Sequence, residues 1–513
     1  MRSRTAGAVM TGETSGRPVE GADLAETHIG IVFFVGDRAY KLKKPVNLGF
    51  LDFSTRELRE RACQEEVRLN RRFSSDVYLG VADVHGPGGD VCDHLVVMRR
   101  MPADRRLSTL VPAGAPVEDA LRDVARTLAA WHAKAPRGPG ISAQETRDAV
   151  RGRWQDSFDQ VRFFHGRVLD AEAAAETEEL AKDFLAGRKA LFDARIDDGR
   201  VVDGHGDLLA GDIFCLDDGP RILDCLEFDE KLRSLDGLDD AAFLAMDLER
   251  LGASKLAERF MDWYADFAAD PAPASLRHHY VAYRAFVRAK VACLRQAQGA
   301  PDAAGEARAY AEVALRHLRA GRVGLILVGG LPGTGKTTLA GELADRLGCS
   351  LLSSDRVRKE LAGLAPTESA AASYGDGIYS AEWTRRTYRE LAERATRLLR
   401  MGETVILDAS WTSQESRDLL AVVAEREHAH LTALRCEAPA SVCAERIRTR
   451  PRGSSDADAE VAAAMRAHAA PWEVSTPVDT AGALAAAVDA ALAAVRPHGA
   501  EHLWPHPPYM APG

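Results

Sequence analysis

One short segment constrains the fold of this chain more than any other feature. Residues 330–337, with the sequence GLPGTGKT, satisfy the pattern G-x-x-x-x-G-K-[ST] in full. The apolar run 323–329 precedes them and predicts a buried strand, and a helical pattern follows them. A glycine-rich loop between a strand and a helix presents backbone amides and a helix N-terminus to phosphate oxygens. The segment therefore predicts a P-loop that binds ATP or a close relative; the alternative is a chance glycine-rich turn.

The loop positions have distinct expected roles. Lys336 is expected to reach the β- and γ-phosphates of ATP, which makes it a candidate catalytic residue, and Thr337 is expected to ligate Mg²⁺. The other residues expected to contact the nucleotide are Gly330, Gly333, Thr334, Gly335 and Thr338.

Strand-like and helix-like patterns alternate after the P-loop, with further strands expected at 350–353, 404–408 and 431–435. Such alternation predicts an α/β domain with a parallel sheet. Asp408 ends the apolar run VILD, at the carboxyl edge where open sheets of this class bind ligands. A carboxylate there is a candidate Mg²⁺ ligand, and the alternative is a helix N-cap.

Asp355 and Arg358 follow the second strand of this region. A carboxylate at that position could accept the proton of an acceptor hydroxyl, and an arginine one helical turn later could hold an anionic group of the substrate. The alternative interpretation is a capping aspartate followed by a solvated arginine.

The stretch 320–495 resembles the small P-loop kinases related to gluconate kinase and to the phage polynucleotide 5′-kinase. The resemblance is carried by the P-loop, by Asp355 and Arg358, by Asp408 and by the arginine-rich segment 445–450. It implies that Asp355 is a general base and that Arg446 and Arg450 belong to a lid that closes over the phosphates. An arginine-rich helix face that is merely solvated is the alternative for the lid.

The region before the P-loop has a different pattern. Residues 27 to about 101 alternate β-rich runs with one charged helix, and Gly36-Asp37 predicts a hairpin between 31–35 and 38–43. Residues 117 to about 320 are mostly helical, with long amphipathic patterns at 238–268, 276–297 and 303–319 and a second hairpin at 213–226.

This second region carries the pattern H-x-D-x-x-x-x-N with one change. His205 and Asp207 match it, and Asp212 stands where the pattern has Asn. In kinase-type catalytic loops the Asp accepts the hydroxyl proton and the residue five positions later binds Mg²⁺. Asp224, at the end of the hairpin, is placed where the second metal-binding Asp is expected. His205 alone is also compatible with a structural role in holding the loop.

Residues 27–318 resemble the aminoglycoside phosphotransferase and choline kinase group, and the whole chain resembles uncharacterised bacterial proteins that join such a domain to a P-loop kinase. The segments 36–57 and 94–101 carry this likeness. It implies that Lys41 grips the α- and β-phosphates, that Glu65 is its ion-pair partner with Glu66 as the competitor, and that Asp212 and Asp224 bind Mg²⁺. Asp212 departs from the family pattern, as does Leu209, where His or Lys is common.

The expected architecture is therefore an α+β, protein-kinase-like N-terminal domain followed by an α/β P-loop domain. A lead-in at 1–26 is expected to be disordered, the small lobe to span about 27–101, the large lobe about 102–318, the P-loop domain 320–497 and a tail 498–513. A chain of 513 residues is too long for one ordinary core.

Composition narrows the function classes. The formal net charge of −10 argues against a general nucleic-acid binder. Eight scattered cysteines without a C-x-x-C pair, no apolar signal segment and no run long enough to span a bilayer are typical of a cytoplasmic protein. Arg284 and Arg288 share a helix face and either line a pocket for an anionic acceptor or form a solvated basic stripe.

Three functions remain open at this level. The first is a phosphotransferase with two ATP sites that acts on hydroxyl groups of small molecules. The second is a P-loop kinase regulated by an N-terminal pseudokinase, for which Asp212 is the motive. The third is a binding protein switched by nucleotide without catalysis. The oligomeric state and the acceptor do not follow from the sequence.

Overall fold

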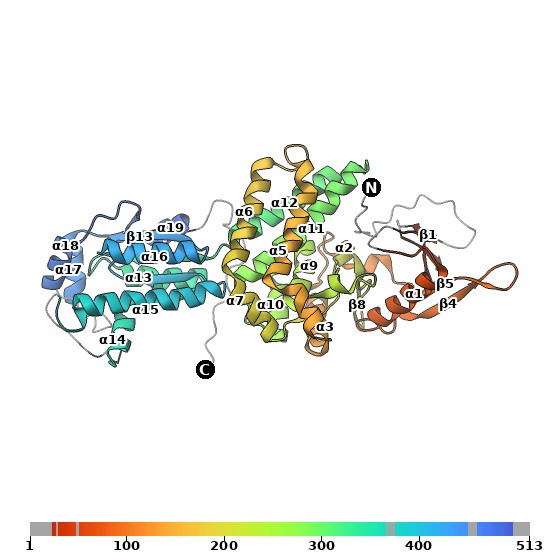
Figure 1. The fold of residues 1–513 in the computed structure, drawn as a ribbon, viewed down its shortest axis with the longest axis horizontal. Coiled ribbons are helices and arrows are strands. Elements are labelled where there is room, and N and C mark those ends of the chain that lie inside the picture. Colours follow the sequence, from red (N-terminus) through yellow and green to blue (C-terminus); the bar gives the residue numbers. More distant parts are fainter. Residues whose placement is uncertain are drawn as a thin grey trace. The chain divides into compact units, whose positions relative to one another are not determined.

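A computed structural model describes residues 23–26, 29–47, 51–365, 368, 375–449 and 459–495 (Figure 1). The chain divides into two compact units. We call the first the N-terminal unit; it holds the chain up to Glu178 together with Phe192–Ala272 and Tyr280–Leu315. We call the second the P-loop unit; it holds Glu179–Leu191, Pro273–His279 and the chain from Arg316 onward.

A five-stranded antiparallel sheet opens the N-terminal unit, in the order β1-β2-β3-β5-β4. Gly36 has a φ of +57°, which suits the tight turn between β2 and β3 and confirms the expected hairpin. The strands are β1 (Asp23–Glu26), β2 (Gly30–Val35), β3 (Arg38–Lys43), β4 (Tyr78–His85) and β5 (Val91–Arg99).

Helix α1 (Arg56–Asn70) packs on β4 and β5 of this sheet. Thr55 caps it by accepting a hydrogen bond from the amide of Leu58 at 3.2 Å. Cys63 and Val67 of α1 join Val96 of the sheet in a buried apolar cluster, which also takes in Leu223 from the second hairpin. Burial of this cluster fixes α1, and with it the side chains that α1 directs toward β3.

The remainder of the N-terminal unit is mostly helical, as expected. The 238–268 pattern is two helices, because the chain turns at Gly252, whose φ is +82°. Parts of α6, α7, α11 and α12 belong to the P-loop unit. The longer helices of this region are α3 (Glu118–Lys134), α5 (Arg147–Val161), α6 (Ala171–Gly187), α7 (Lys189–Asp197), α9 (Gly237–Arg250), α10 (Ser254–Ala268), α11 (Ala274–Ala297) and α12 (Ala303–Ala320).

Short elements complete this region. The second expected hairpin is present as β7 (Ile213–Leu216) and β8 (Gly219–Ile222), and β6 (Val201–Asp203) pairs with β9 (Ser234–Asp236). The α+β class expected for this unit is confirmed. The short helices are α2 (Leu107–Leu110), α4 (Pro139–Ser142) and α8 (Glu230–Arg233).

The P-loop unit contains a five-stranded, all-parallel sheet in the order β11-β12-β10-β13-β14. Strand β10 is apolar at consecutive positions because a parallel sheet covered on both faces buries each of them. The strands are β10 (Gly324–Gly329), β11 (Ser350–Ser353), β12 (Val405–Asp408), β13 (His430–Glu437) and β14 (Thr476–Asp479).

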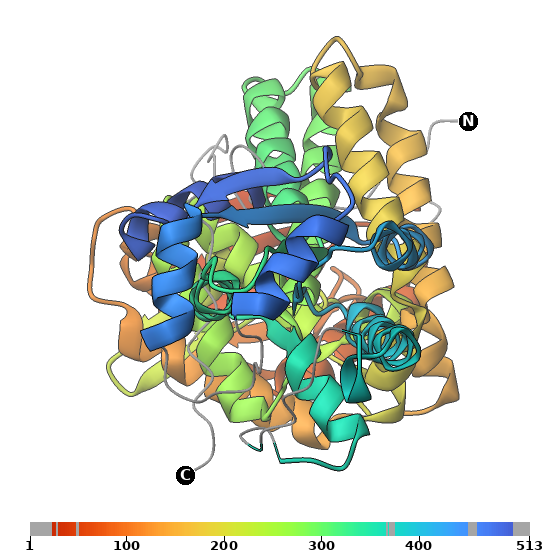
Figure 2. The ribbon, with the colours of Figure 1, turned by 90° about the vertical axis from the view of Figure 1, so that its left-hand side faces the viewer.

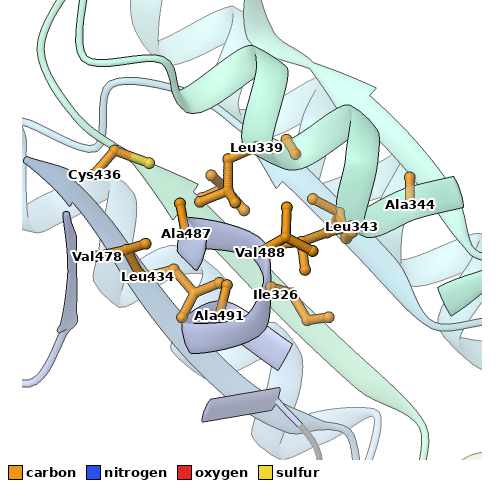
Figure 3. Close-up of a cluster of buried hydrophobic side chains, with 13 residues drawn as sticks. Ile326, Leu339, Leu343, Ala344, Leu434, Cys436, Val478, Ala487, Val488 and Ala491 are labelled. Atoms are coloured by element: carbon orange, nitrogen blue, oxygen red, sulfur yellow. The ribbon is translucent and has the colours of Figure 1, made fainter. Parts of the chain in front are cut away.

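Helices cover both faces of this sheet. Ile326 and Val328 of β10 belong to one buried apolar cluster with Leu339 of α13 and Val488 of α19. Figure 3 shows Ile326, Leu339 and Val488 in this cluster. Helix α15 contacts β10 and β12, and α16 contacts β13, and the two helices lie side by side when viewed end-on in Figure 2. The helices are α13 (Lys336–Leu347), α14 (Ser354–Leu361), α15 (Ala381–Arg400), α16 (Gln414–Arg426), α17 (Ala440–Thr449), α18 (Ala459–His468) and α19 (Leu484–Val495).

Several sequence expectations need correction or addition. The lead-in was expected to be disordered to residue 26, but Asp23–Glu26 forms β1 and pairs with β2; residues 1–22 and the tail lie outside the described residues. Strands β4 and β14 had no sequence prediction. The described part of the chain has no helix that is both long and apolar enough to cross a membrane, and all eight cysteines are free thiols.

Candidate functional site

The P-loop connects β10 to α13 and has the tight backbone that its glycines allow. Gly330 and Gly333 have φ values of +145° and +83°. A Cβ on Gly330 would lie 2.5 Å from the Thr334 hydroxyl oxygen, and one on Gly333 would lie 2.5 Å from the Cys443 carbonyl oxygen. Substitution of either glycine would therefore both strain the backbone and clash with the loop's surroundings.

Thr337 and Asp408 meet beside the P-loop lysine. The Thr337 hydroxyl donates to Asp408 Oδ2 at 2.8 Å, because β10 and β12 are adjacent parallel strands whose carboxyl ends lie together. Burial raises the pKa of Asp408, and the positive charge of Lys336 opposes that rise. The other oxygen, Oδ1, is buried without a hydrogen-bond partner among the described residues. A hydroxyl and a carboxylate oxygen at this edge are the hard ligands that Mg²⁺ prefers, so these residues fit the ion.

Asp355 and Arg358 lie in α14, directly after β11. Asp355 is partly exposed, and its charge contributes to raising the pKa of Asp408, so the two carboxylates are neighbours. Arg358 is buried: its Nη1 donates to the Ile378 carbonyl oxygen at 2.8 Å and to the Thr384 hydroxyl at 3.2 Å. The alternative of a solvated arginine is therefore wrong, while its role in substrate binding stays a prediction.

The remaining predicted nucleotide contacts are placed around the loop. Arg446 of α17 lies over the P-loop, since its Nη2 donates to the Thr480 carbonyl oxygen at 2.7 Å and its Nη1 lies 3.5 Å from the Gly333 carbonyl oxygen. Thr334 is turned inward and its hydroxyl donates to the Leu331 carbonyl oxygen at 2.8 Å, whereas Thr338 is exposed. Arg450 lies outside the described residues.

A cavity of about 820 Å³ adjoins the outer side of the P-loop. Its walls include Gly330 and Leu331 of the loop and the indole rings of Trp411 and Trp472. Three arginines also line it: Arg417, Arg435 and Arg466. The Nε atoms of Arg417 and Arg435 are buried and lack a hydrogen-bond partner within the described ranges. Sequence reasoning missed this cavity, because its lining comes from five separate segments.

In the N-terminal unit, Lys41 of β3 lies in an ion-pair cluster. Its Nζ is 2.8 Å from Glu66 Oε1 and 2.8 Å from Asp224 Oδ1. The prediction that Glu65 is the ion-pair partner of Lys41 is wrong. Glu65 is partly exposed and instead pairs with Arg68 at 2.5 Å. Adjacent residues on a helix point about 100° apart, so only one of the two glutamates can face the sheet. Glu66 is that residue and is fully buried.

A second lysine shares this cluster and was not predicted. Lys43 follows Lys41 by two residues and so lies on the same face of β3. Its Nζ is 2.7 Å from Glu66 Oε2 and 2.6 Å from Glu227 Oε1. The two lysines lower the pKa of Glu66 to about 2 despite its burial. The alternating pattern of β3 was a signal in the sequence, because it placed both lysines toward α1.

The loop that carries Asp207 is held by Asp240, at the start of α9. The amides of His205 and Gly206 donate to the two Asp240 carboxylate oxygens at 2.6 and 2.9 Å. These bonds and the nearby His132 lower the pKa of Asp240 to about 2. His205 Nε2 lies 3.0 Å from the Leu223 carbonyl oxygen, which ties the loop to the second hairpin. The role of Asp240 was not predicted from the sequence, because nothing in the sequence shows that an acidic residue of this helix binds the loop.

Asp207, Asp212 and Asp224 form a region of like charge. Burial raises the pKa values of Asp207 and Asp212, and Asp224 adds to both shifts. Asp224 adopts a left-handed backbone with a φ of +64°. Among the described residues no group of three or more His, Cys, Asp or Glu side chains has metal-binding geometry. Mg²⁺ binding by Asp212 and Asp224 stays a prediction.

Arg284 and Arg288 of α11 are both buried, so the alternative of a solvated basic stripe is wrong. Arg284 forms a two-point ion pair with Asp239, with distances of 2.7 and 2.6 Å. The positive charge of Arg288 opposes the rise in the pKa of Asp207, so Arg288 lies near the proposed base.

Residues 325–472, which include the P-loop, Asp355, Asp408 and Arg446, match the family model described as AAA domain. Uncharacterized protein Rv2004c of Mycobacterium tuberculosis is 44% identical over 460 residues, which are 90% of this chain and 92% of that protein. Uncharacterized protein Mb2027c of Mycobacterium bovis is similar to the same degree.

Two solved structures are among those to which the chain is similar. A choline/ethanolamine kinase family protein from Mesorhizobium loti is 15% identical, with a TM-score of 0.37, and the alignment covers 61% of this chain and 93% of that chain. A gluconokinase from Sinorhizobium meliloti is 20% identical, with a TM-score of 0.24, and the alignment covers 34% of this chain and 91% of that chain.

Proposed function

The chain belongs to the same family as the Mycobacterium tuberculosis protein Rv2004c, and we propose that it is an ATP-dependent phosphotransferase. Its P-loop unit would transfer the γ-phosphoryl group of ATP to a hydroxyl group of a small acidic molecule. The observation that carries the proposal is the pairing of Thr337 with Asp408 beside Lys336, with a second buried Asp408 oxygen left for a cation.

Each residue has a chemical task in this proposal. Lys336 and the P-loop amides bind and orient the β- and γ-phosphates. Mg²⁺, held by Thr337 and Asp408, would neutralise phosphate charge. In the transfer, the acceptor oxygen forms a bond to the γ-phosphorus, the bond from that phosphorus to the β–γ bridging oxygen breaks, and the acceptor proton passes to Asp355. ADP and a phosphate monoester are the products.

The charge of the large cavity supports an acidic acceptor. Arg417, Arg435 and Arg466 line it, against the carboxylates of Glu437 and Asp479. Arg435 is paired with Glu437 at 2.9 Å, whereas the Nε atoms of Arg417 and Arg435 have no partner in the described part of the chain. Guanidinium groups with spare donors bind carboxylates and phosphates well. Its volume of about 820 Å³ is in the range of small-molecule sites.

For the N-terminal unit we propose a second nucleotide site of lower catalytic capacity. Lys41, Glu66 and Asp224 stand together, and Asp240 holds the loop of the proposed base Asp207. The extra carboxylate of Asp212 adds like charge to this site and, unlike Asn, an ionised carboxylate cannot donate a hydrogen bond. Regulation of the P-loop unit by a nucleotide bound here is the alternative.

Acceptor-dependent release of ADP by the full-length chain tests the proposal. Sugar acids and sugar phosphates are expected to be phosphorylated, and the matching neutral sugars are the comparison. Asp408→Asn should remove most of the turnover, and Arg346→Ala, an exposed change on α13, is the matched control. Absence of phosphorylated product from every acceptor, acidic or neutral, with intact ATP binding, would contradict the transferase.

Arg466→Ala tests the acceptor class separately. We expect a higher KM for acidic acceptors and an unchanged KM for ATP, because Arg466 lines the cavity without belonging to the P-loop. Arg397→Ala, on an exposed position of α15, is the control. Equal effects of Arg466→Ala on acidic and neutral acceptors would refute the acidic acceptor but leave phosphoryl transfer itself intact.

A further inference from the structure

A second, smaller cavity lies in the P-loop unit at the amino ends of the parallel strands, away from the P-loop. Its volume is about 240 Å³, and all of its lining residues belong to this one unit. Val323 and His430 line it where β10 and β13 begin, whereas the P-loop follows Gly329 at the opposite ends of these parallel strands. The cavity is therefore separate from the proposed nucleotide site.

The chemistry of this cavity centres on Arg188, a lining residue between α6 and α7 whose side chain is fully buried. Its Nη1 donates to the carbonyl oxygens of Glu427 at 2.8 Å and Gly187 at 3.0 Å, and its Nη2 donates to that of His428 at 3.1 Å. The Nε is buried and has no hydrogen-bond partner among the residues described. A guanidinium has five N–H donors, so these bonds leave its capacity unfilled.

Arg188 also has no carboxylate to neutralise it. Across the described ranges it makes no ion pair. The nearest influence is Glu427, whose carboxylate is bound by Arg400 at 2.8 Å and by Arg426 at 2.7 Å. Burial accordingly lowers the pKa of Arg188 to about 10, with only partial opposition from Glu427. A buried cation without a counter-charge is costly, which favours an anion beside it.

The other charges around the cavity are compatible with an anion. Arg322 lies in its wall, and its positive charge together with burial lowers the pKa of His430. Two carboxylates also line the cavity, those of Asp183 and Glu425. Asp183 is engaged by His428 Nδ1 at 3.4 Å.

We propose that this cavity binds a small oxyanion, inorganic phosphate or the phosphate group of a small metabolite, with Arg188 as its principal ligand and Arg322 at its mouth. The volume is below that of most drug-sized sites, so a compact ligand fits best. The site would respond to phosphate at a place distinct from the P-loop. It does not depend on the proposed phosphotransferase activity.

Hydrogen exchange of the full chain, resolved by peptide, tests this site, with inorganic phosphate as the probe and chloride at equal ionic strength as the reference. Phosphate at about ten times its Kd should slow exchange about ten-fold at amides that open only from the free site. We expect this protection in segments 179–188 and 424–431. The P-loop peptide 330–338 serves as an internal comparison, because it can bind phosphate independently.

Arg188→Gln should abolish protection of 179–188 and 424–431 and leave that of 330–338 unchanged. If this variant does not fold, Arg322→Gln carries the test, because Arg322 is exposed and its loss should weaken the same protection at a given phosphate concentration. Arg397→Gln, an exposed change outside the cavity, is the matched control. Protection confined to the P-loop peptide in the wild-type chain, or persistence of the other protection in both variants, would overturn the proposal.

Discussion

The two candidate sites differ in what their lysines contact. Lys41 of the N-terminal unit lies 2.8 Å from both Glu66 and Asp224, so its charge is neutralised within the protein. Lys336 of the P-loop makes no ion pair in the part of the chain that the structure describes. Asp408 beside it keeps one buried oxygen without a hydrogen-bond partner within that part. The P-loop site therefore keeps charged and polar groups available for a ligand, whereas the charged groups of the N-terminal site mostly bind one another.

The difference follows from how each fold binds phosphate. A P-loop uses backbone amides, which the strand and helix fix before any ligand arrives. The N-terminal site relies on side chains, and Lys41 must exchange Asp224 for phosphate oxygens before it can grip a nucleotide. We therefore expect the P-loop unit to dominate turnover.

Loss of the P-loop lysine should have the largest effect. Lys336→Ala is expected to lower acceptor-dependent ADP release by roughly 1,000-fold, because positioning and charge stabilisation supply most of the catalysis in phosphoryl transfer. Lys41→Ala in the same assay should leave most of the turnover. An equal loss of ADP release in Lys41→Ala and Lys336→Ala, with both variants folded, would contradict this contrast.

The ion pairs inside the N-terminal site predict that loss of the Glu66 carboxylate has a large effect on stability. Glu66→Gln removes the buried carboxylate shared by Lys41 and Lys43 and should cost about 3 kcal/mol in the free energy of unfolding of the N-terminal unit. Since the lysines lower the pKa of Glu66 to about 2 from 4.5, this contribution is present above pH 4.5 and is lost as the pH falls toward 2. Urea unfolding at pH 7 measures it.

The neighbouring glutamate is the matched control for this change. Glu65→Gln removes a surface ion pair with Arg68 and should change the free energy of unfolding by about 0.5 kcal/mol or less. Equal effects of the two substitutions would mean that Glu66 does not hold the lysines as the structure has them.

Asp212 predicts an effect of intermediate size that depends on pH. Burial and the charges of Asp224 and Asp207 raise the pKa of Asp212 well above 3.8 in the folded chain. The unfolded chain therefore loses this proton first, and the folded chain loses stability as the pH rises from about 4 through the folded-state pKa. Asp212→Asn avoids the loss and should be more stable by on the order of 2 kcal/mol at pH 8.

The exposed Asp217 provides the comparison for that measurement. Asp217→Asn should change the free energy of unfolding by about 0.5 kcal/mol or less, because Asp217 is almost fully exposed and forms a surface ion pair with Arg105. Unfolding curves for both variants from pH 5 to pH 8 distinguish the cases. A stability difference for Asp212→Asn that is constant over this range would contradict the raised pKa of Asp212.

Local patterns predicted much of this molecule, and contacts between distant segments account for what they missed. The P-loop and its strand follow from a continuous motif, and β2, β3, β7 and β8 from turn residues between apolar runs. The choice between Glu65 and Glu66 depends on how α1 is rotated against β3, which spacing alone does not fix. Asp240 and the large cavity depend on segments brought together only by folding.

Charge patterns on helices were the sequence feature that predicted burial least well. Arg284 and Arg288 have the spacing of a solvated stripe, yet both are buried, since Asp239 of another helix neutralises one and Asp207 lies near the other. Arg358 likewise reads as a surface residue but is held by the segment 378–384. Burial of arginine depends on partners that one sequence does not reveal.

The smallest predicted effect concerns Arg446, the described lid arginine that lies over the P-loop. Its Nη1 would be 3.4 Å from a Cβ on Gly335, and its Nη2 donates to the Thr480 carbonyl oxygen. Arg446→Ala should raise the KM for ATP of the P-loop unit about ten-fold, the value of one charge-assisted contact of about 1.4 kcal/mol. Steady-state kinetics in a Lys41→Ala background isolates this unit.

Arg448 supplies a control from the same helix. It is exposed and pairs with Glu445, so Arg448→Ala should leave the KM unchanged. If Arg446→Ala instead lowers kcat and leaves the KM for ATP unaltered, Arg446 acts on the transfer step rather than on nucleotide binding. Catalysis at the P-loop site would then depend on a side chain as well as on backbone amides, and the contrast between the two sites would hold for binding but not for catalysis.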